Sequence, residues 1–188
     1  MLERIEEFGK HLVITGFKGV KVGNVEAFFK AIRNEKLSNV EIQFFDAQLV
    51  ATSQHLYFAV LNALTAFKNG ENISRNLAME IMLYASAQRQ IRKAMKLLGI
   101  TRRSSDIATM IVADKPDSAK AALSIVAQNL RAKPDDAVVE LTRGKVKSIR
   151  RVFGISQAEL EAVGKGDGLE AALVDLVIER MALLSTQR

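Results

Sequence analysis

The alternation of hydrophobic and polar positions predicts short strands separated by amphipathic helices. Residues 11–17 and 40–45 are rich in β-branched and aromatic side chains and are bounded by Gly or Asn, so both are predicted strands. Residues 107–113 predict a third strand for the same reason. Between the first two, Asn24 is placed to cap a helix whose apolar side chains recur with helical spacing. The N-terminal half therefore begins as strand, helix, strand.

Three helices are predicted between the second and third strands, at residues 53–68, 74–84 and about 87–98. Gly70 ends the first of them, and Ser74 is placed as the N-cap of the second. The first helix is apolar nearly all round. It must therefore be covered on most of its sides.

The C-terminal part of the chain has only helical periodicity. A helix at 117–130 follows the third strand, and the pattern beyond Pro134 is helical to a final helix at 169–184. Ser156 and Glu159 match a capping box, which predicts another helix start. Short strands interleaved with helices predict an α+β fold, with a small, mostly antiparallel sheet covered by several helices and a helical C-terminal half.

Composition narrows the class of protein. A length of 188 residues favours one domain over residues 1–188, and the 48% hydrophobic content is enough to form a core. The chain has no Cys, which excludes disulfides, thiolate zinc sites and cysteine nucleophiles. Its most apolar stretch, residues 56–67, is shorter than the roughly 20 residues that cross a bilayer, and the N-terminus lacks a secretory pattern. We expect a cytoplasmic protein with no membrane partner.

Motifs for catalysis are missing from the sequence. There is no G-x-S-x-G nucleophile motif, and His11 and His55 lie in apolar segments, where a histidine is more often structural than a general base. The carboxylates have no spacing that would converge on a metal. Residues 164–168 (GKGDG) follow a helix and lack the Gly-Lys-Ser/Thr ending of a phosphate loop. We therefore expect no catalytic residue, metal or cofactor; a small enzyme using His55 or this loop is the least favoured alternative.

A basic segment is the main candidate for binding chemistry. Residues 81–105 contain no Asp or Glu but include Arg89, Arg92, Lys93, Lys96, Arg102 and Arg103. On a helix, positions 89, 92, 93 and 96 would share a wedge of roughly 100°, with Ile91, Ala94, Met95 and Leu98 on the opposite side. A solvated surface is the simple alternative. However, without acidic partners at i,i+4 these cations repel one another, and a phosphate backbone would relieve that repulsion.

Polar side chains near this segment extend the candidate interface. Amides and guanidinium groups placed together can hydrogen-bond base edges and phosphates, although a polar contact between helices is the structural alternative. The predicted RNA-binding residues are Asn72, Arg75, Arg89, Arg92, Lys93 and Lys96. A second basic run either extends this surface or only solubilises its helix; it comprises Arg143, Lys145, Lys147, Arg150 and Arg151.

One stretch resembles a known family. Residues 71–95 (ENISRNLAMEIMLYASAQRQIRKAM) are similar to the signature of the TPRKB-type, PRPK-binding accessory subunit of the KEOPS transfer-RNA modification complex, in its archaeal form. The order and spacing of Phe45-Asp46-Ala47, Phe153-Gly154-Ile155-Ser156 and Glu179-Arg180 also match. The resemblance covers nearly the whole chain.

This resemblance implies a non-catalytic adaptor. Such subunits bind the small atypical kinase of KEOPS, which contacts the threonylcarbamoyl-transferase subunit that acts on transfer RNA beside the anticodon. Archaeal relatives also help to hold transfer RNA at its single-stranded CCA end. Ile149, Phe153 and Leu183 are the candidate kinase contacts, with core packing as the alternative. A general nucleic-acid-binding protein without a kinase partner is the second functional hypothesis.

Overall fold

The computed structural model describes residues 2–35, 37–164 and 168–186. The chain forms two compact units, each made from two separate stretches: residues 1–47 with 100–139, and residues 48–99 with 140–188. We call these the sheet unit and the helical unit. The single domain over 1–188 stays a prediction.

The described residues of the sheet unit form a four-stranded antiparallel sheet in the order β1-β2-β4-β3. The strands are β1 (Leu2–Ile5), β2 (Lys10–Phe17), β3 (Val40–Asp46) and β4 (Ile107–Ala113). Every residue of the central strand β4 is buried. The three strands predicted from sequence are confirmed. The fourth, β1, has two charged residues among its four and therefore carries no hydrophobic signal.

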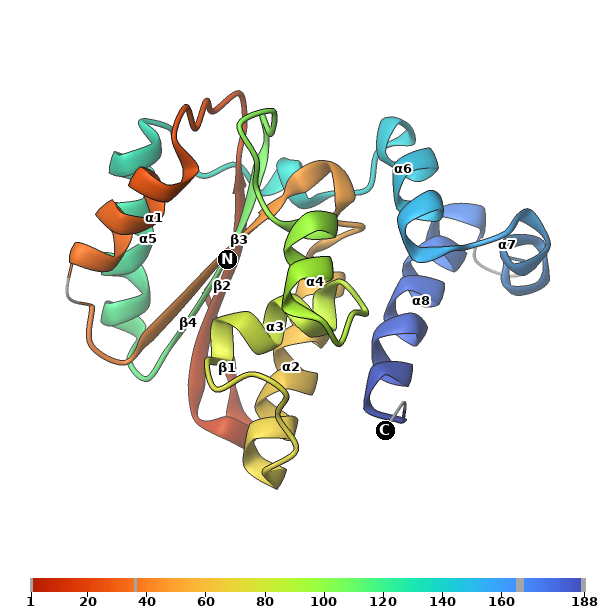
Figure 1. Cartoon of the computed structure of the whole chain (residues 1–188), viewed down its shortest axis with the longest axis horizontal. Coiled ribbons are helices and arrows are strands. Elements are labelled where there is room, and N and C mark those ends of the chain that lie inside the picture. The colour runs from red at the N-terminus through yellow and green to blue at the C-terminus, as the bar shows by residue number, and fades with distance from the viewer. Residues whose placement is uncertain (1, 36, 165–167, 187–188) are drawn as a thin grey trace. The chain divides into compact units, whose positions relative to one another are not determined.

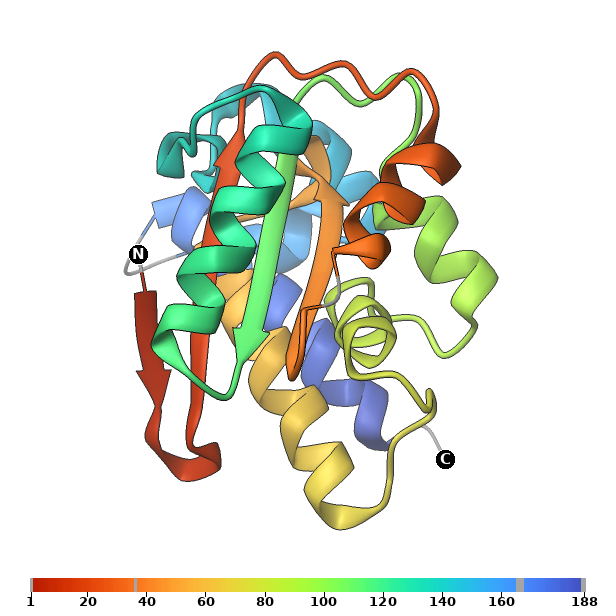
Figure 2. The same cartoon turned by 90° about the vertical axis from the view of Figure 1, so that its left-hand side faces the viewer.

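Two helices, α1 (Val25–Asn34) and α5 (Pro116–Leu130), lie side by side on one face of this sheet (Figures 1 and 2). The predicted cap of α1 is confirmed, because the Asn24 side chain accepts a hydrogen bond from the backbone N–H of Ala27 at 3.0 Å. Apolar side chains from both helices and the sheet form the core of the unit, among them Phe28, Phe44 and Val126.

A short 3₁₀ helix, η3 (Asp136–Val139), packs against β2 and requires a glycine there. A Cβ at Gly16 would lie 2.4 Å from the side chain of Val138, which is inside contact distance. The backbone N–H of Asp135 also donates to the carbonyl of Gly16 at 2.8 Å. Gly16 therefore allows the chain that leaves α5 to close against the sheet.

Thr109 gives a test of packing in β4. Its hydroxyl is buried and is without a hydrogen-bond partner among the described residues. We expect Thr109→Val, which keeps the shape and removes the hydroxyl, to raise the free energy of unfolding by about 1 kcal/mol. Thr109→Ser, which keeps the hydroxyl and loses the methyl group, should lower it. Chemical denaturation of both variants measures this, and a less stable valine variant would contradict the assignment.

The described part of the helical unit forms six α-helices. They are α2 (Ser53–Asn69), α3 (Leu77–Ala85), α4 (Ile91–Leu98), α6 (Arg143–Phe153), α7 (Gln157–Val163) and α8 (Gly168–Ala182). Helix α2 packs against α3 and α8, and α8 also contacts α6 and α7. The predicted end of α2 is confirmed by Gly70 in the left-handed region, and the predicted capping box is confirmed at Ser156 and Glu159.

The α+β prediction is confirmed, since the described residues form eight α-helices and a small antiparallel sheet. All regular elements that the structure describes beyond Pro134 are helices, as predicted. In the part of the chain that the structure describes, none of the helices combines the length and apolar character that a membrane crossing requires.

Candidate nucleic-acid interface

The candidate basic surface of the helical unit begins on α4. Arg92, Lys93 and Lys96 are exposed, while Ala94 and Leu98 are buried, so the predicted division into a charged and a packed face is confirmed on this helix. Among the described residues no acidic side chain forms an ion pair with these three cations. Three positive charges on one short helix are therefore exposed, and none of them is neutralised by an ion pair with a described carboxylate.

The predicted start of this helix at about residue 87 is wrong. Ala87 adopts a left-handed backbone (φ 51°), so α3 and α4 are separated by a turn, and α4 begins at Ile91. Arg89 therefore lies in the turn and not on the helix. Its guanidinium Nη1 donates to the carbonyl of Leu184 at 3.4 Å, which leaves other N–H groups on the same side chain.

Ile91 was predicted to pack, but its side chain is 46% exposed. It occupies the first position of α4, where the preceding turn leaves it outside the packed face. The first turn of α4 thus presents an apolar side chain next to Arg92 and Lys93.

Asn72 and Arg75 lie in the loop that precedes α3. The predicted cap Ser74 is wrong, because Asn76 caps α3 through a 2.9 Å bond from the N–H of Met79 to its Oδ1. Asn72 is half-buried and its Nδ2 donates to the carbonyl of Ser74 at 3.0 Å, so its amide helps to hold the loop. Arg75 is exposed.

Glu80 holds this loop in place, and sequence reasoning missed it. The side chain is completely buried, and its carboxylate accepts the N–H of Ile73 (3.1 and 3.0 Å to the two oxygens) and the N–H of Ser74 (2.6 Å). Because Glu80 binds these two N–H groups, the chain before Leu77 forms a loop and not a helical turn. A single acid inside the apolar run LAMEIMLYA was the available signal.

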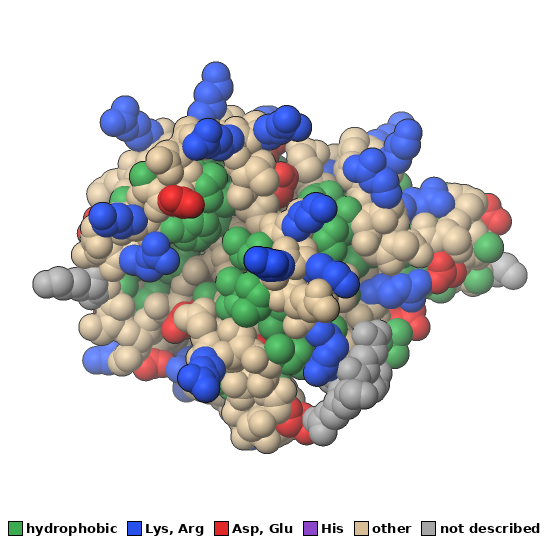
Figure 3. Space-filling model, in the orientation of Figure 1, with side chains coloured by type: hydrophobic (Ala, Val, Ile, Leu, Met, Phe, Trp, Pro, Cys, Tyr) green, Lys and Arg blue, Asp and Glu red, His purple; other side chains and the backbone are tan. Residues whose placement is uncertain are grey.

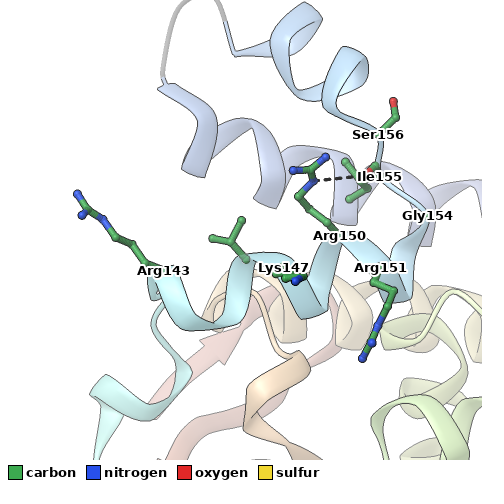
Figure 4. Close-up of a pocket in the computed structure, with 8 residues that line it drawn as sticks. Arg143, Lys147, Arg150, Arg151, Gly154, Ile155 and Ser156 are labelled. Atoms are coloured by element: carbon green, nitrogen blue, oxygen red, sulfur yellow. Dashed lines mark hydrogen bonds between the residues drawn. The ribbon is translucent and has the colours of Figure 1, made fainter.

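The second basic run forms a separate cluster on α6. An open pocket of about 710 Å³ is lined by Arg143, Val146, Lys147, Arg150, Arg151, Gly154, Ile155 and Ser156 (Figure 4). Lys145 does not belong to it: this side chain is buried, and its Nζ donates to the carbonyl of Glu140 at 2.8 Å. Figure 3 shows Lys and Arg side chains over both α4 and α6 on the face in view.

His55 has a structural environment. It is completely buried; Nε2 lies 2.7 Å from the carbonyl of Ala85, and Nδ1 accepts the N–H of Ala51 at 3.2 Å. Both bonds form together only in the neutral ring with its proton on Nε2. Burial lowers the pKa of His55 to about 4, against a smaller opposing effect of its bond to Ala85. The histidine thus joins α2 to the end of α3.

Comparison with known proteins identifies the family. The family model described as "Kinase binding protein CGI-121" matches residues 17–185. The chain belongs to this family. A CGI-121 relative from Methanocaldococcus jannaschii, named "Regulatory protein Cgi121", is 26% identical over 177 residues, covering 94% of this chain and 99% of that protein. Another from Aspergillus fumigatus, named "EKC/KEOPS complex subunit cgi121", is 27% identical over 159 residues, covering 80% and 82%. The resemblance inferred from residues 71–95 is confirmed.

The candidate kinase contacts differ in their accessibility in this CGI-121 family member. Ile149 and Phe153 are buried in the core of the helical unit, where they pack with Leu173 and Val177 of α8. Their side chains therefore serve packing, and burial removes them from the set of direct contacts. Leu183 is 41% exposed and stays a prediction.

The glycine-rich loop falls partly outside the described residues, because 165–167 are not described. For the rest of the chain, no group of three or more metal-ligating side chains is found among the described residues.

Proposed function

We propose that this chain is the non-catalytic accessory subunit of a cytoplasmic KEOPS-type complex, which binds the small atypical kinase subunit and recruits transfer RNA. The observation that carries the proposal is the match of the kinase-binding CGI-121 family model over residues 17–185. The KEOPS subunit name of the Aspergillus fumigatus relative supports the choice of complex. Through the kinase, the chain acts with the threonylcarbamoyl-transferase subunit, which forms threonylcarbamoyladenosine next to the anticodon.

The exposed apolar side chains support the helical unit as the kinase-binding part. Among the described residues, the large hydrophobic side chains with substantial exposure all belong to it: Phe58, Ile73, Ile91, Val163, Leu169 and Leu183. Covering an apolar side chain with a partner removes its area from water, so the helical unit offers a kinase more apolar surface than the described sheet unit does. Leu183, the first residue of the short 3₁₀ helix η4 (Leu183–Thr186) that follows α8, is the contact carried forward from sequence.

Co-elution with the small atypical kinase from the same genome tests the proposal. We expect a stable complex at size exclusion, and Leu183→Asp should weaken it about tenfold or more, because a carboxylate would be desolvated in the interface. Ala121→Asp is the control, since Ala121 is exposed on α5 of the sheet unit and adds the same charge outside the helical unit. If the unaltered proteins do not associate, the proposal of a kinase adaptor is contradicted. RNA binding without kinase binding would then favour a general nucleic-acid-binding protein.

The transfer-RNA part rests on α4 and its neighbouring turn. Arg92, Lys93 and Lys96, with Arg89 and Arg75 close by in sequence, provide cations without described acidic partners. Phosphates relieve the repulsion between such charges, and guanidinium groups stack on unpaired bases such as those of the CCA end. Asn72 contributes by holding the loop that carries Arg75.

Neutralising two of these cations tests the assignment. We expect Arg92→Gln with Lys93→Gln to weaken transfer-RNA binding about tenfold at roughly 0.1 M salt. The slope of log affinity against log salt should also fall, by the amount that corresponds to about one lost phosphate contact or more. Fluorescence anisotropy measures the affinity and its salt dependence, with intact transfer RNA and with transfer RNA lacking CCA. Lys18→Gln with Lys21→Gln removes the same charge from exposed positions of the sheet unit and serves as control. Equal affinities for the two double variants would contradict the α4 assignment.

A further inference from the structure

The cluster on α6 is arranged on one side of its helix. Four cations line the pocket: Arg143, Lys147, Arg150 and Arg151. They recur at intervals of four, three and one residues, which places them on neighbouring turns, while Lys145, Ile149 and Phe153 form the buried side. The charged side is therefore built by the periodicity of α6 itself.

These charges are not neutralised within the described part of the helical unit. Helix α6 contains no acidic residue, and none of the four cations forms an ion pair with a described carboxylate. Glu159, just beyond the pocket-lining Ser156, is bound by the backbone N–H and hydroxyl of that serine and by Arg180. These hydrogen bonds, with the backbone bond to Ser156 as the largest cause, lower the pKa of Glu159 to about 2. Its charge is therefore already compensated.

The position of the first cation is unfavourable for the helix alone. Arg143 is the first residue of α6, where the helix dipole favours a negative charge. The Nε–H of Arg150 donates to the carbonyl of Ile155 at 3.4 Å, so the other N–H groups of its guanidinium can donate to another acceptor (Figure 4). An anion bound beside α6 would offset both the unfavourable interaction of Arg143 with the helix dipole and the repulsion between the four cations.

The pocket has the shape of a track and not of an enclosed site. The cations extend over residues 143–151, which is about 12 Å along a helix axis, or several steps of about 3.4 Å in a stacked nucleic-acid strand. Figure 4 shows Arg143 and Arg151 pointing in different directions, so their ends do not converge on one phosphate group. Val146 adds an apolar contact between the charges.

We propose that the α6 pocket binds the sugar-phosphate backbone of a single RNA strand, as a second contact separate from α4. The choice of RNA as the ligand of this pocket rests on the proposed function. The cations bind successive phosphates, Val146 contacts a sugar or base, and the arginine planes stack on exposed bases. A compact polyphosphate would instead need donors that converge on one point.

Arg143→Gln with Lys147→Gln tests the proposal in the full chain. Removing a cation from the first turn of α6 does not disfavour the helix, so we expect the variant to melt at or above the wild-type temperature. Its affinity for an unstructured RNA of about 16 nucleotides should fall about fivefold or more at roughly 0.1 M salt, and the slope of log affinity against log salt should fall by about 1.4, for two lost phosphate contacts.

The controls separate this proposal from the α4 assignment. Lys18→Gln with Lys21→Gln removes the same net charge and should bind the 16-mer within about twofold of wild type. If affinity for the 16-mer falls in the α6 double variant but not in Arg92→Gln with Lys93→Gln, the α6 proposal is supported and the α4 assignment is contradicted. If affinity falls only in the α4 double variant, the α4 assignment is supported and the α6 proposal is contradicted. Wild-type affinity that is equal for RNAs of about 4 and 16 nucleotides, together with displacement by ATP, would show a compact polyphosphate site and overturn the track.

Discussion

Replacement of Glu80 by alanine is expected to lower the free energy of unfolding by about 3 kcal/mol, because two charge-assisted bonds to backbone N–H groups are lost and a buried cavity is left. The carboxylate binds the N–H groups of Ile73 and Ser74 from inside the helical unit. The N–H of Ser74 is in a buried residue and would have no acceptor of equal quality. Loss of these bonds should also release the loop that carries Asn72 and Arg75.

Chemical denaturation measures the stability, and hydrogen exchange at the Ile73 and Ser74 amides reports on the loop. Glu80→Gln keeps the shape and one acceptor oxygen, so we expect it to lose about half as much stability as the alanine variant. Glu170→Ala, at an exposed position in the first turn of α8, should cost about 0.5 kcal/mol or less. Unchanged exchange at both amides in Glu80→Ala would show that the loop is held by other contacts.

The sequence predicted those elements that are set by residues within the element or at its ends. β4 is a continuous run of seven residues, all of them buried, and its composition is that of a strand regardless of its neighbours. Asn24 and Ser156 formed the predicted caps because each bonds to an N–H three residues ahead. β1 lacked any such signal, since its place depends on pairing with β2.

The start of α3 shows where local signals compete. Ser74 and Asn76 both have the chemistry of a cap, and sequence favoured the earlier one. The choice is made by Glu80, whose buried carboxylate takes the N–H of Ser74 and leaves Asn76 to begin the helix. The left-handed Ala87 likewise lies where the sequence predicted the start of the third helix, and α4 begins only at Ile91. Neither outcome follows from propensity.

The candidate sites divide in the same way. The exposed cations of α4 follow from helical period, once the helix is known to begin at Ile91. Lys145 of α6 could not be assigned by charge, because its stem is buried and its ammonium group reaches the carbonyl of Glu140. Ile149 and Phe153 required knowledge of which side of α6 meets α8.

Acidification is expected to destabilise the helical unit through His55. Its pKa is about 4 in the folded chain, against 6.5 for the free side chain, because burial disfavours the charged ring. The unfolded state therefore binds a proton first as the pH falls. The stabilisation is complete above pH 6.5 and is lost between pH 6.5 and 4, by about 3 kcal/mol in total and about 2 kcal/mol by roughly pH 5.

A pair of non-titrating variants isolates this effect. In His55→Asn an oxygen takes the place of Nδ1 as acceptor for Ala51, and in His55→Gln an amide nitrogen takes the place of Nε2 as donor to Ala85. Both should be less stable than wild type at pH 7.5, since each keeps one of two bonds and loses the edge-on contact with Phe153. Their unfolding free energies should change less between pH 7.5 and about 5 than that of wild type, by about 2 kcal/mol. An equal pH dependence in wild type and variants would mean that His55 titrates alike in the folded and unfolded chain, and that its ring is not held neutral between α2 and α3.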